Sequence, residues 1–462
     1  MSFFSQYQVI TPVVIIGLFW IIPRKYRAYL VLGGSYMFYG LFRLSYVFLL
    51  AAVTLSNYYG SIVLAKNEKH IRKRILFIIL AFNLLLLVVF KYLDFLLFNY
   101  KGILGLLGIT VPLLSFEILL PVGISFYTFQ CLGYTIDVYK NECKATKKLL
   151  DFALFASFFP QLIAGPIESA KNLLPQIKFS QKFDMNNFWR GVDLIIWGIF
   201  KKLVIADGIG MYVDYVFSNN SSFLLTLTAS FAFGLQIYSD FSAYTDIARG
   251  LGKLFMVDLM KNFNSPFLAP SPKEFFKRWH MSLYKWVIKY LFIPLGGSKK
   301  STFRVAVNIM AVWLIMGLWH GASWTYVLWG VYCGVLVVIS HFEVKNSGKI
   351  FRGYSGIFLT YTLINSSFLI FRSPSISYFF SIIANPVVGF FSHIDAACIL
   401  AVITAVYSIP IILVDSIKSF LEKAENMGRW LYPMRIIVYH ILISVTVLLA
   451  PQYTEYFIYF QF

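Results

Sequence analysis

Long runs of apolar residues recur along the whole chain and are separated by short polar segments. Crossing the hydrocarbon core of a bilayer as a helix takes about 20 predominantly apolar residues. Several runs are shorter, so we expect some to be re-entrant or interfacial and about 11 or 12 to be true crossings. The pattern predicts an all-α, polytopic integral membrane protein. The candidate segments are 7–22, 28–43, 45–65, 76–98, 102–122, 152–168, 188–216, 223–250, 304–320, 324–341, 356–372, 394–414 and 434–450.

Basic residues gather in the short segments between these runs, which is typical of cytoplasmic loops. Clusters of Lys and Arg stand at 66–74, 140–148, 261–304 and 418–435. Arg24, Lys25 and Arg27 follow the first run, whereas positions 1–8 carry no positive charge. The first run is therefore predicted to be a retained span with the N-terminus outside, not a removable signal. The last run follows a basic cluster, so both termini are expected outside, which favours an even number of crossings.

Composition excludes a soluble protein and a disordered one. Hydrophobic residues make up 59% of the 462 residues and charged residues 13%, whereas a soluble domain carries about 25% charged residues. The net charge of +19 is distributed over loops, so we expect no nucleic-acid partner. No fixed-period repeat, linker or low-complexity tract divides the chain. We predict one domain over residues 1–462, a multi-pass protein of the cell membrane surrounded by lipid.

His320 is the strongest candidate for chemistry. It lies in the uncharged run WLIMGLWHGASW (313–324). Counted from Arg304 at the predicted cytoplasmic edge, the helix rises about 24 Å into a hydrocarbon core about 30 Å thick. Polar side chains at that depth usually line a cavity or pathway, and the following Gly321 permits a close approach or a helix break. A neutral imidazole can accept a proton from a hydroxyl, the task of a general base in acyl transfer. The alternative is a histidine bonded to a backbone carbonyl.

The other histidines stand in different settings. His280 lies in FFKRWHMSLYKW (275–286), where aromatic and basic residues alternate without a full-length apolar run. This pattern predicts a helix lying at the cytoplasmic interface, either as an anchor or as a binding site for the phosphates of a bulky anionic donor. His70 falls in a basic loop. The remaining histidines, His341, His393 and His440, fall near the ends of predicted spans, where no function is needed.

Two aspartates, Asp240 and Asp246, fall inside the apolar segment 223–250. At 100° per residue they do not share one face of a helix. The sequence contains no metal-ligand spacing, no GxSxG elbow, no Walker loop and no GxGxxG opening a helix, so we expect no bound metal.

Six motifs occur in order along the chain: PVGISFYTFQ (121–130), FFPQLIAGP (158–166), QIYSDFSAYTD (236–246), RWH (278–280), PLGG (294–297) and GLWHGA (317–322). Together they resemble the membrane-bound O-acyltransferase family, specifically its bacterial alginate O-acetyltransferase-like branch. The motifs cover about residues 120–325, and the layout of spans extends the likeness over the whole chain. The resemblance implies a ring of helices around a thinned centre, with a tunnel joining the two membrane faces.

The resemblance also implies site residues. His320 matches the Trp-His-Gly motif and would be the catalytic histidine, and His280 matches Arg-Trp-His and would assist it or line the donor side. For Asp240 and Asp246 we also expect structural support. The donor-binding candidates are Lys277, Arg278, Trp279, Trp319 and Asp240. The donor is expected to enter from the cytoplasm near Lys273, Lys277, Arg278, Lys285 and Lys289.

The implied activity moves an acetyl group from a cytoplasmic thioester, such as acetyl-CoA used as a substrate without a bound cofactor, to a polysaccharide acceptor outside. That polymer would be alginate-like, another exopolysaccharide or peptidoglycan, and a separate extracytoplasmic acyltransferase resembling a Ser hydrolase would complete the transfer. One alternative is D-alanyl transfer from a carrier protein to teichoic acid, although such relatives usually lack the final span at 434–450. Another is a transporter, but inverted repeats and paired intramembrane charges are not found.

Tyr459 lies in the tail 451–462, which the last span is predicted to deliver to the outer face. An aromatic belt at the interface explains such a tail. The tail also resembles the aromatic, Tyr-containing C-terminal motif of this bacterial branch. A phenol ester keeps a good leaving group, because the unperturbed pKa of a tyrosine hydroxyl is about 10. We therefore predict that Tyr459 is a transient acyl carrier.

Overall fold

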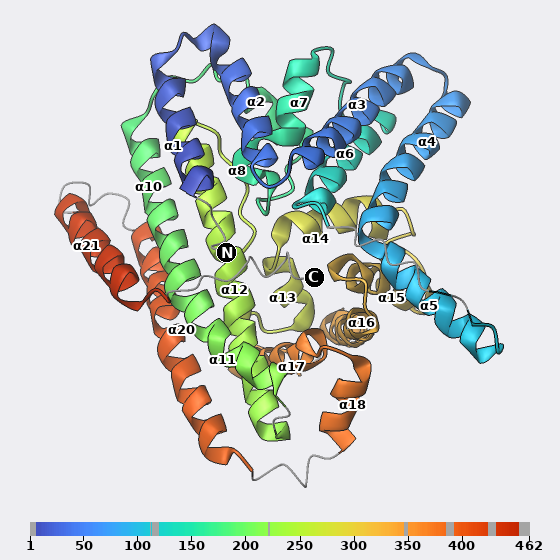
Figure 1. The fold of residues 1–462 in the computed structure, drawn as a ribbon, viewed down its shortest axis with the longest axis vertical. Coiled ribbons are helices and arrows are strands. Elements are labelled where there is room, and N and C mark those ends of the chain that lie inside the picture. The colour runs from blue at the N-terminus through green and yellow to red at the C-terminus, as the bar shows by residue number, and fades with distance from the viewer. Residues whose placement is uncertain are drawn as a thin grey trace. The chain divides into compact units, whose positions relative to one another are not determined.

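The computed structural model describes residues 6–110, 112, 120–219, 222–345, 350–384, 392–423 and 431–451. Every regular element in these ranges is a helix (Figure 1), which confirms the predicted all-α class. The chain forms two compact units. The N-terminal unit comprises the described residues of Phe4–Val192 and Ala248–Met260, and the C-terminal unit those of Asp193–Ile247 and Lys261–Phe462. The sequence predicts a single domain over residues 1–462, and the division into two compact units does not test that prediction.

The N-terminal unit is built from helical hairpins. Contacts pair α1 with α2 and α3 with α4, and α6 packs against both α3 and α4. Its elements are α1 (Gln6–Ile21), α2 (Arg24–Gly40), α3 (Leu44–Lys66), α4 (Lys69–Leu87), the π-helical turn η1 (Val88–Tyr92), α5 (Leu93–Leu106), α6 (Ile124–Tyr139), α7 (Leu149–Ser157), α8 (Phe159–Leu162), α9 (Ala170–Gln176) and the first half of α10 (Met185–Phe200).

In the C-terminal unit, α15 and α16 form an antiparallel pair, α16 packs on α17, and the short α13 contacts both α16 and α17. Its elements are the rest of α10, η2 (Lys201–Ala206), α11 (Asp207–Ser218), α12 (Phe223–Leu254) up to residue 247, η3 (Pro266–Leu268), α13 (Pro272–Arg278), α14 (Met281–Val287), η4 (Ile288–Phe292), α15 (Thr302–His320), α16 (Trp324–Lys345), α17 (Gly353–Arg372), α18 (Ile376–Ala384), α20 (Ile394–Lys423) and α21 (Leu431–Leu449).

Six helices in the described ranges are long and apolar enough to cross a membrane, which supports a multi-pass membrane protein. They are Leu44–Lys66, Lys69–Leu106, Thr302–His320, Trp324–Glu343, Gly353–Arg372 and Ile394–Val414. The predicted total of 11 or 12 crossings and the outward termini stay predictions.

Two of the predicted spans are wrong as single helices. The segment 152–168 contains the end of α7 and the four-residue α8, because Phe158 leaves the helical region of backbone space (φ −52°, ψ 103°). The segment 102–122 begins inside α5, which ends at Leu106, and positions 111 and 113–119 lie outside the described residues.

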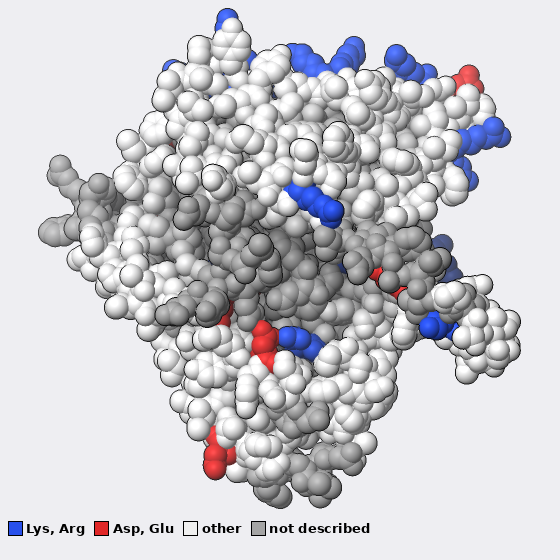
Figure 2. Space-filling model, in the orientation of Figure 1, with Lys and Arg blue, Asp and Glu red and all other residues white. Residues whose placement is uncertain are grey.

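Two of the predicted cytoplasmic loops lie on the same side of the N-terminal unit. Arg72 at the start of α4 donates from Nη2 to the carbonyl oxygens of Val138 (2.9 Å) and Tyr139 (2.6 Å) at the end of α6. A cation at these carbonyls complements the negative end of the helix dipole. The 66–74 and 140–148 clusters are thereby brought together, as the positive-inside pattern requires. Figure 2 shows Lys and Arg gathered along the edge where the α1–α2 and α3–α4 turns lie.

The first two sequence motifs contact each other inside this unit. Gln130 in α6 donates from Nε2 to the Phe155 carbonyl, and its Oε1 accepts from the backbone N–H of Glu168 (3.0 Å). Gly123 precedes α6 with φ +74°, and a Cβ there would overlap the Leu162 carbonyl oxygen. Only glycine fits both the left-handed backbone and this close approach. The motifs at 121–130 and 158–166 therefore join α6 to the α7–α8 turn.

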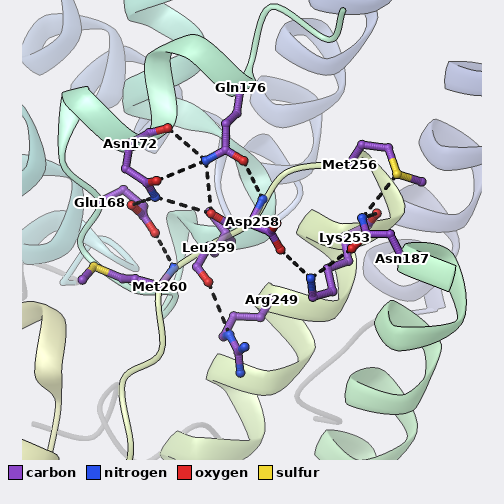
Figure 3. Close-up of polar contacts among 10 residues, drawn as sticks. All are labelled: Glu168, Asn172, Gln176, Asn187, Arg249, Lys253, Met256, Asp258, Leu259 and Met260. Carbon is purple, nitrogen blue, oxygen red and sulfur yellow. Dashed lines mark hydrogen bonds and ion pairs between the residues drawn. The ribbon is translucent and has the colours of Figure 1, made fainter. Parts of the chain in front are cut away.

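A polar network fixes the turn that follows α12 (Figure 3). Glu168, which is buried, accepts from the Met260 N–H (2.6 Å) and from Asn172 Nδ2 (2.7 Å). Gln176 exchanges two hydrogen bonds with the backbone of Asp258, accepting at 2.7 Å and donating at 3.2 Å. Lys253 also pairs with the carboxylate of Asp258. These bonds attach residues 258–260, which form no regular secondary structure, to α9 and to Glu168 just before it.

Replacing Gly123 with alanine should destabilise the protein strongly. The left-handed backbone alone costs a non-glycine residue about 1–2 kcal/mol, and the overlap with the Leu162 carbonyl adds to that cost. Gly102→Ala is the matched control, because a Cβ at Gly102 in α5 meets nothing within 4 Å. Thermal unfolding in detergent should show a lower midpoint for Gly123→Ala than for the unmodified protein, and no decrease for Gly102→Ala. Equal midpoints for the two variants would contradict the packing described here.

Candidate active site

The position of His320 is set by close packing of α15 against α16. A Cβ at Gly317 would overlap the carbonyl of Tyr326 and lie 3.2 Å from the Gly330 Cα, and a Cβ at Gly330 would lie 2.6 Å from the Trp313 carbonyl. Small residues let membrane helices approach this closely. The helix α15 ends at His320, and Gly321 follows it in an extended conformation. This is the helix break that the sequence allowed at Gly321.

The His320 imidazole is buried among aromatic rings. Its ring centroid lies 4.9 Å from Trp319, 5.0 Å from Trp329 and 5.4 Å from Phe371, each with steep interplanar angles. Edge-to-face contacts of this kind fix the orientation of a ring. The side chain is 9% exposed, so it is enclosed by the unit.

His280 stands at a corner between two short helices, so the predicted single interfacial helix over 275–286 is wrong. α13 ends at Arg278, and His280 adopts a left-handed backbone (φ 45°, ψ 55°) before α14 begins. Asn262 holds this corner: its carbonyl accepts from the Met281 N–H (2.9 Å) and its Oδ1 from the Ser282 N–H (3.2 Å). A non-glycine residue in this conformation persists only when its surroundings over-determine it.

His280 is also buried, whereas the alternating aromatic and basic residues around it suggested an interfacial anchor. It is 3% exposed, and its ring packs edge-on against Phe241 of α12 at 4.6 Å. Burial lowers the pKa of His280 well below its usual range, and the nearby His320 lowers it further. Desolvation disfavours the charged imidazole. His280 is therefore neutral at physiological pH.

A cavity of about 330 Å³ connects the two histidines. On α15 its wall extends from Ile309 to His320, and on α16 from Trp329 to His341. At 1.5 Å per residue each wall is about 17 Å long. The cavity is therefore elongated and narrow. Its lining is mostly apolar, and the polar side chains besides the two histidines come from Lys273, Tyr284, Ser298 and His341.

The predicted site residues divide around this cavity. His320, His280 and Trp279 line it, and so does Lys273. Trp319 lies behind the wall, with its ring 4.9 Å from His320 and 6.0 Å from His280. Lys277 and Arg278 instead contact Glu274, at 3.5 Å and 3.2 Å. Asp240, Lys277, Arg278, Lys285 and Lys289 are not among the side chains that line the cavity. Tyr459 lies outside the described residues.

Asp240 and Asp246 take part in buried ion pairs. Lys202 of η2 lies 3.0 Å from Asp240 and 2.7 Å from Asp207, while Lys201 lies 2.8 Å from Asp246. Because the two lysines are neighbours, their side chains leave η2 in different directions and reach aspartates on different faces of α12. This agrees with the expected supporting role. Asp240 also precedes Phe241, whose ring contacts His280.

Several residues escaped the sequence analysis. Lys201 and Lys202 look like the basic residues of a loop, and nothing in the sequence pairs them with aspartates about 40 positions away. Asn262 accepts hydrogen bonds from backbone N–H groups at the His280 corner, and such bonds leave no trace in the sequence. His341 was assigned to a span end, yet it lines the cavity. Its neighbour Ser340 accepts from the Lys273 N–H at 3.3 Å.

No metal centre is found in the part of the chain that the structure describes: no three His, Cys, Asp or Glu side chains group closely enough there.

Replacing Lys202 with methionine should destabilise the fold by about 3–5 kcal/mol, because it leaves two buried carboxylates without their shared cation. Lys277→Met removes the same charge from an exposed pair and should cost less than about 1 kcal/mol. The comparison is made by thermal unfolding and by the yield of monodisperse protein. A Lys202→Met variant as stable as Lys277→Met would contradict the role given to the ion pairs.

Comparison with known proteins agrees with the motifs. The sequence model of MBOAT, the membrane-bound O-acyltransferase family, matches residues 144–383. The chain is 35% identical over 365 residues to "Probable alginate O-acetylase AlgI" of Azotobacter vinelandii, covering 78% of this chain and 72% of the relative. It is 33% identical over 386 residues to "Peptidoglycan O-acetyltransferase" of Helicobacter pylori, covering 77% and 72%.

A more distant relative is "Teichoic acid D-alanyltransferase" of Streptococcus thermophilus, which is 28% identical over 285 residues, covering 54% of this chain and 68% of the relative. The family match over more than half of the chain and the long alignments at a third identity agree with each other. They confirm the resemblance inferred from the six motifs. The chain belongs to the membrane-bound O-acyltransferase family.

Proposed function

We propose that this enzyme transfers an acetyl group from a thioester donor on the cytoplasmic side to a hydroxyl group of a cell-envelope polysaccharide. The relatives named for alginate and peptidoglycan acetylation align over more of the chain than the D-alanyltransferase does. This favours acetyl over D-alanyl as the transferred group. It also favours an acceptor with sugar hydroxyls.

The observation that carries the proposal is the narrow cavity lined by both motif histidines. His320 comes from the end of α15 and His280 from the α13–α14 corner, about 40 residues earlier, and both side chains line one space. An elongated apolar channel suits an extended, uncharged arm that presents a thioester at its tip. Ligand sites are typically mostly apolar with a few placed polar groups.

The chemistry follows from a neutral imidazole beside the thioester carbonyl. His320 accepts the proton of the attacking hydroxyl while the hydroxyl oxygen forms a bond to the carbonyl carbon. The carbon–sulfur bond then breaks, and the departing sulfur takes up the proton from His320. Ester and thiol are the products, so the imidazole is regenerated. His280, also neutral, serves as a polar neighbour of the reacting group on the donor side.

The donor end of the cavity is marked by Lys273 and His341. Lys273 is partly buried, which lowers the pKa of its ammonium. The charged groups of a donor such as acetyl-CoA stay outside the apolar channel because their desolvation is costly. A lysine at the mouth of the channel suits such a group better than Lys277 and Arg278, which already pair with Glu274.

The second half of the reaction, delivery of the acyl group to the polymer, involves a separate protein and the C-terminal tail. We propose that a separate extracytoplasmic acyltransferase completes the transfer to the polymer, with Tyr459 as an acyl carrier between the two. The argument for Tyr459 is chemical, since an aryl ester stays reactive toward the next hydroxyl. Tyr459→Phe keeps the aromatic ring and removes the hydroxyl.

Substituting His320 with alanine should reduce acetylation of the envelope polymer to background, because the proton acceptor is lost. His70→Ala is the matched control, since His70 is exposed in the first turn of α4. The measurement is ester-linked acetate per unit of purified polymer, in cells with equal amounts of each variant in the membrane. Near-normal acetate with His320→Ala would exclude His320 as the base.

Reversing the charge of Lys273 should raise the KM for the acetyl thioester by about tenfold with a smaller change in kcat, as expected for a binding contact. The KM of the unmodified enzyme should increase with ionic strength, and that of Lys273→Glu should depend on it less. Lys69→Glu, at an exposed position at the start of α4, is the control. An unchanged KM for Lys273→Glu at low ionic strength would argue against this donor end.

A further inference from the structure

A second, much smaller cavity lies against His320. Its volume is about 10 Å³, which is room for one group of about the size of a water molecule or a methyl. It shares His320, Trp329, Trp279 and Phe276 with the large cavity. The small cavity therefore begins where the large one ends, and His320 stands at their junction.

The far wall of the small cavity is apolar and rigid. It is made by side chains that do not line the large cavity: Ile237, Phe275, Ile364, Phe368 and Phe371. Each of these is at most 4% exposed. The five side chains of this wall carry no hydrogen-bonding group, so they do not replace the hydration that a polar group loses on entering.

Helix α17 supplies most of this wall, and contacts at three points fix it. Trp329 of α16 donates from Nε1 to Ser367 Oγ at 3.2 Å. Phe371 packs edge-on against Trp329 at 5.2 Å and against Tyr326 at 4.9 Å. Beyond Phe371, Arg372 binds Asp214 of α11 at 2.5 Å. The wall is thus tied to α16 and α11, and closely packed interiors do not expand freely to admit extra atoms.

We propose that the small cavity receives the methyl end of the acyl group and thereby restricts the enzyme to acetyl transfer. The inference rests on the proposed function and adds the size limit of the acyl group. With the thioester carbonyl beside His320, the atoms on its far side from the sulfur fall at the junction of the two cavities. A methyl fills the small cavity, whereas a propionyl or butyryl chain overlaps α17, and a D-alanyl group, which carries an amino group beside its methyl, exceeds the volume.

The test is the acyl-length preference of purified enzyme supplied with acetyl-, propionyl- and butyryl-CoA. One extra methylene in a tight apolar pocket costs about 10-fold or more in kcat/KM. The unmodified enzyme should show such a preference for acetyl over propionyl. Ile364→Ala, which removes part of the wall, should raise the propionyl-to-acetyl ratio of kcat/KM by about tenfold. Ile364→Phe, which fills the small cavity, should depress acetyl transfer more than any other substitution at this wall.

Leu369→Ala is the control, because Leu369 is equally buried on α17 but lines neither cavity. It should leave the ratio unchanged. Phe368→Leu supplies a second opening variant with the same expected shift as Ile364→Ala, so the test does not depend on one substitution folding. Equal use of all three donors by the unmodified enzyme, or an unchanged ratio in both opening variants, would overturn the proposal. Either result leaves transfer at His320 intact, whereas activity of His320→Ala would remove the proposed function itself.

Discussion

The close contact between α15 and α16 is the interaction on which the rest of the site depends. Gly317 and Gly330 let the two backbones come into contact, and this contact fixes the position of the last turn of α15. His320 is the last residue of that helix, so its imidazole is positioned by backbone packing and by three aromatic rings, with no flexible segment between. In a membrane interior, where apolar surface gives little drive for helices to associate, such shape complementarity is the main source of precision.

The charges buried around η2 and α12 compensate one another. Lys201 and Lys202 lie among Asp207, Asp240 and Asp246, and burying any of these groups alone would cost several kcal/mol. The pairs connect η2 with α12, and α12 presents Phe241 to the His280 ring. His280 itself is held at a left-handed corner by Asn262. His280 is thus fixed by contacts that lie outside the cavity it lines, whereas His320 also packs against Trp329 of the cavity wall.

The sequence was sufficient for the helical membrane class and for the end of α15 at His320, and it singled out two histidines that line one cavity. These features depend on local composition and on short motifs. It was insufficient for the His280 corner, since alternating aromatic and basic residues look like an interfacial helix unless the backbone bonds from Asn262 are known. The motif aspartates were found without their lysines for a similar reason, because the pairs join distant segments. The sequence placed Lys273, Lys277 and Arg278 together at the donor entry and did not show that Lys273 lines the cavity while the other two contact Glu274.

The central claim is that a thioester reaches His320 through the narrow cavity. Electron cryomicroscopy of the enzyme with a non-transferable analogue of acetyl-CoA, in which a methylene replaces the thioester sulfur, tests this most directly. The account predicts density for the pantetheine arm in the cavity lined by α13, α14, α15 and α16, with the analogue's carbonyl within hydrogen-bond distance of His320 and its methyl against α17. An arm bound elsewhere, with the cavity beside His320 unfilled, would contradict it.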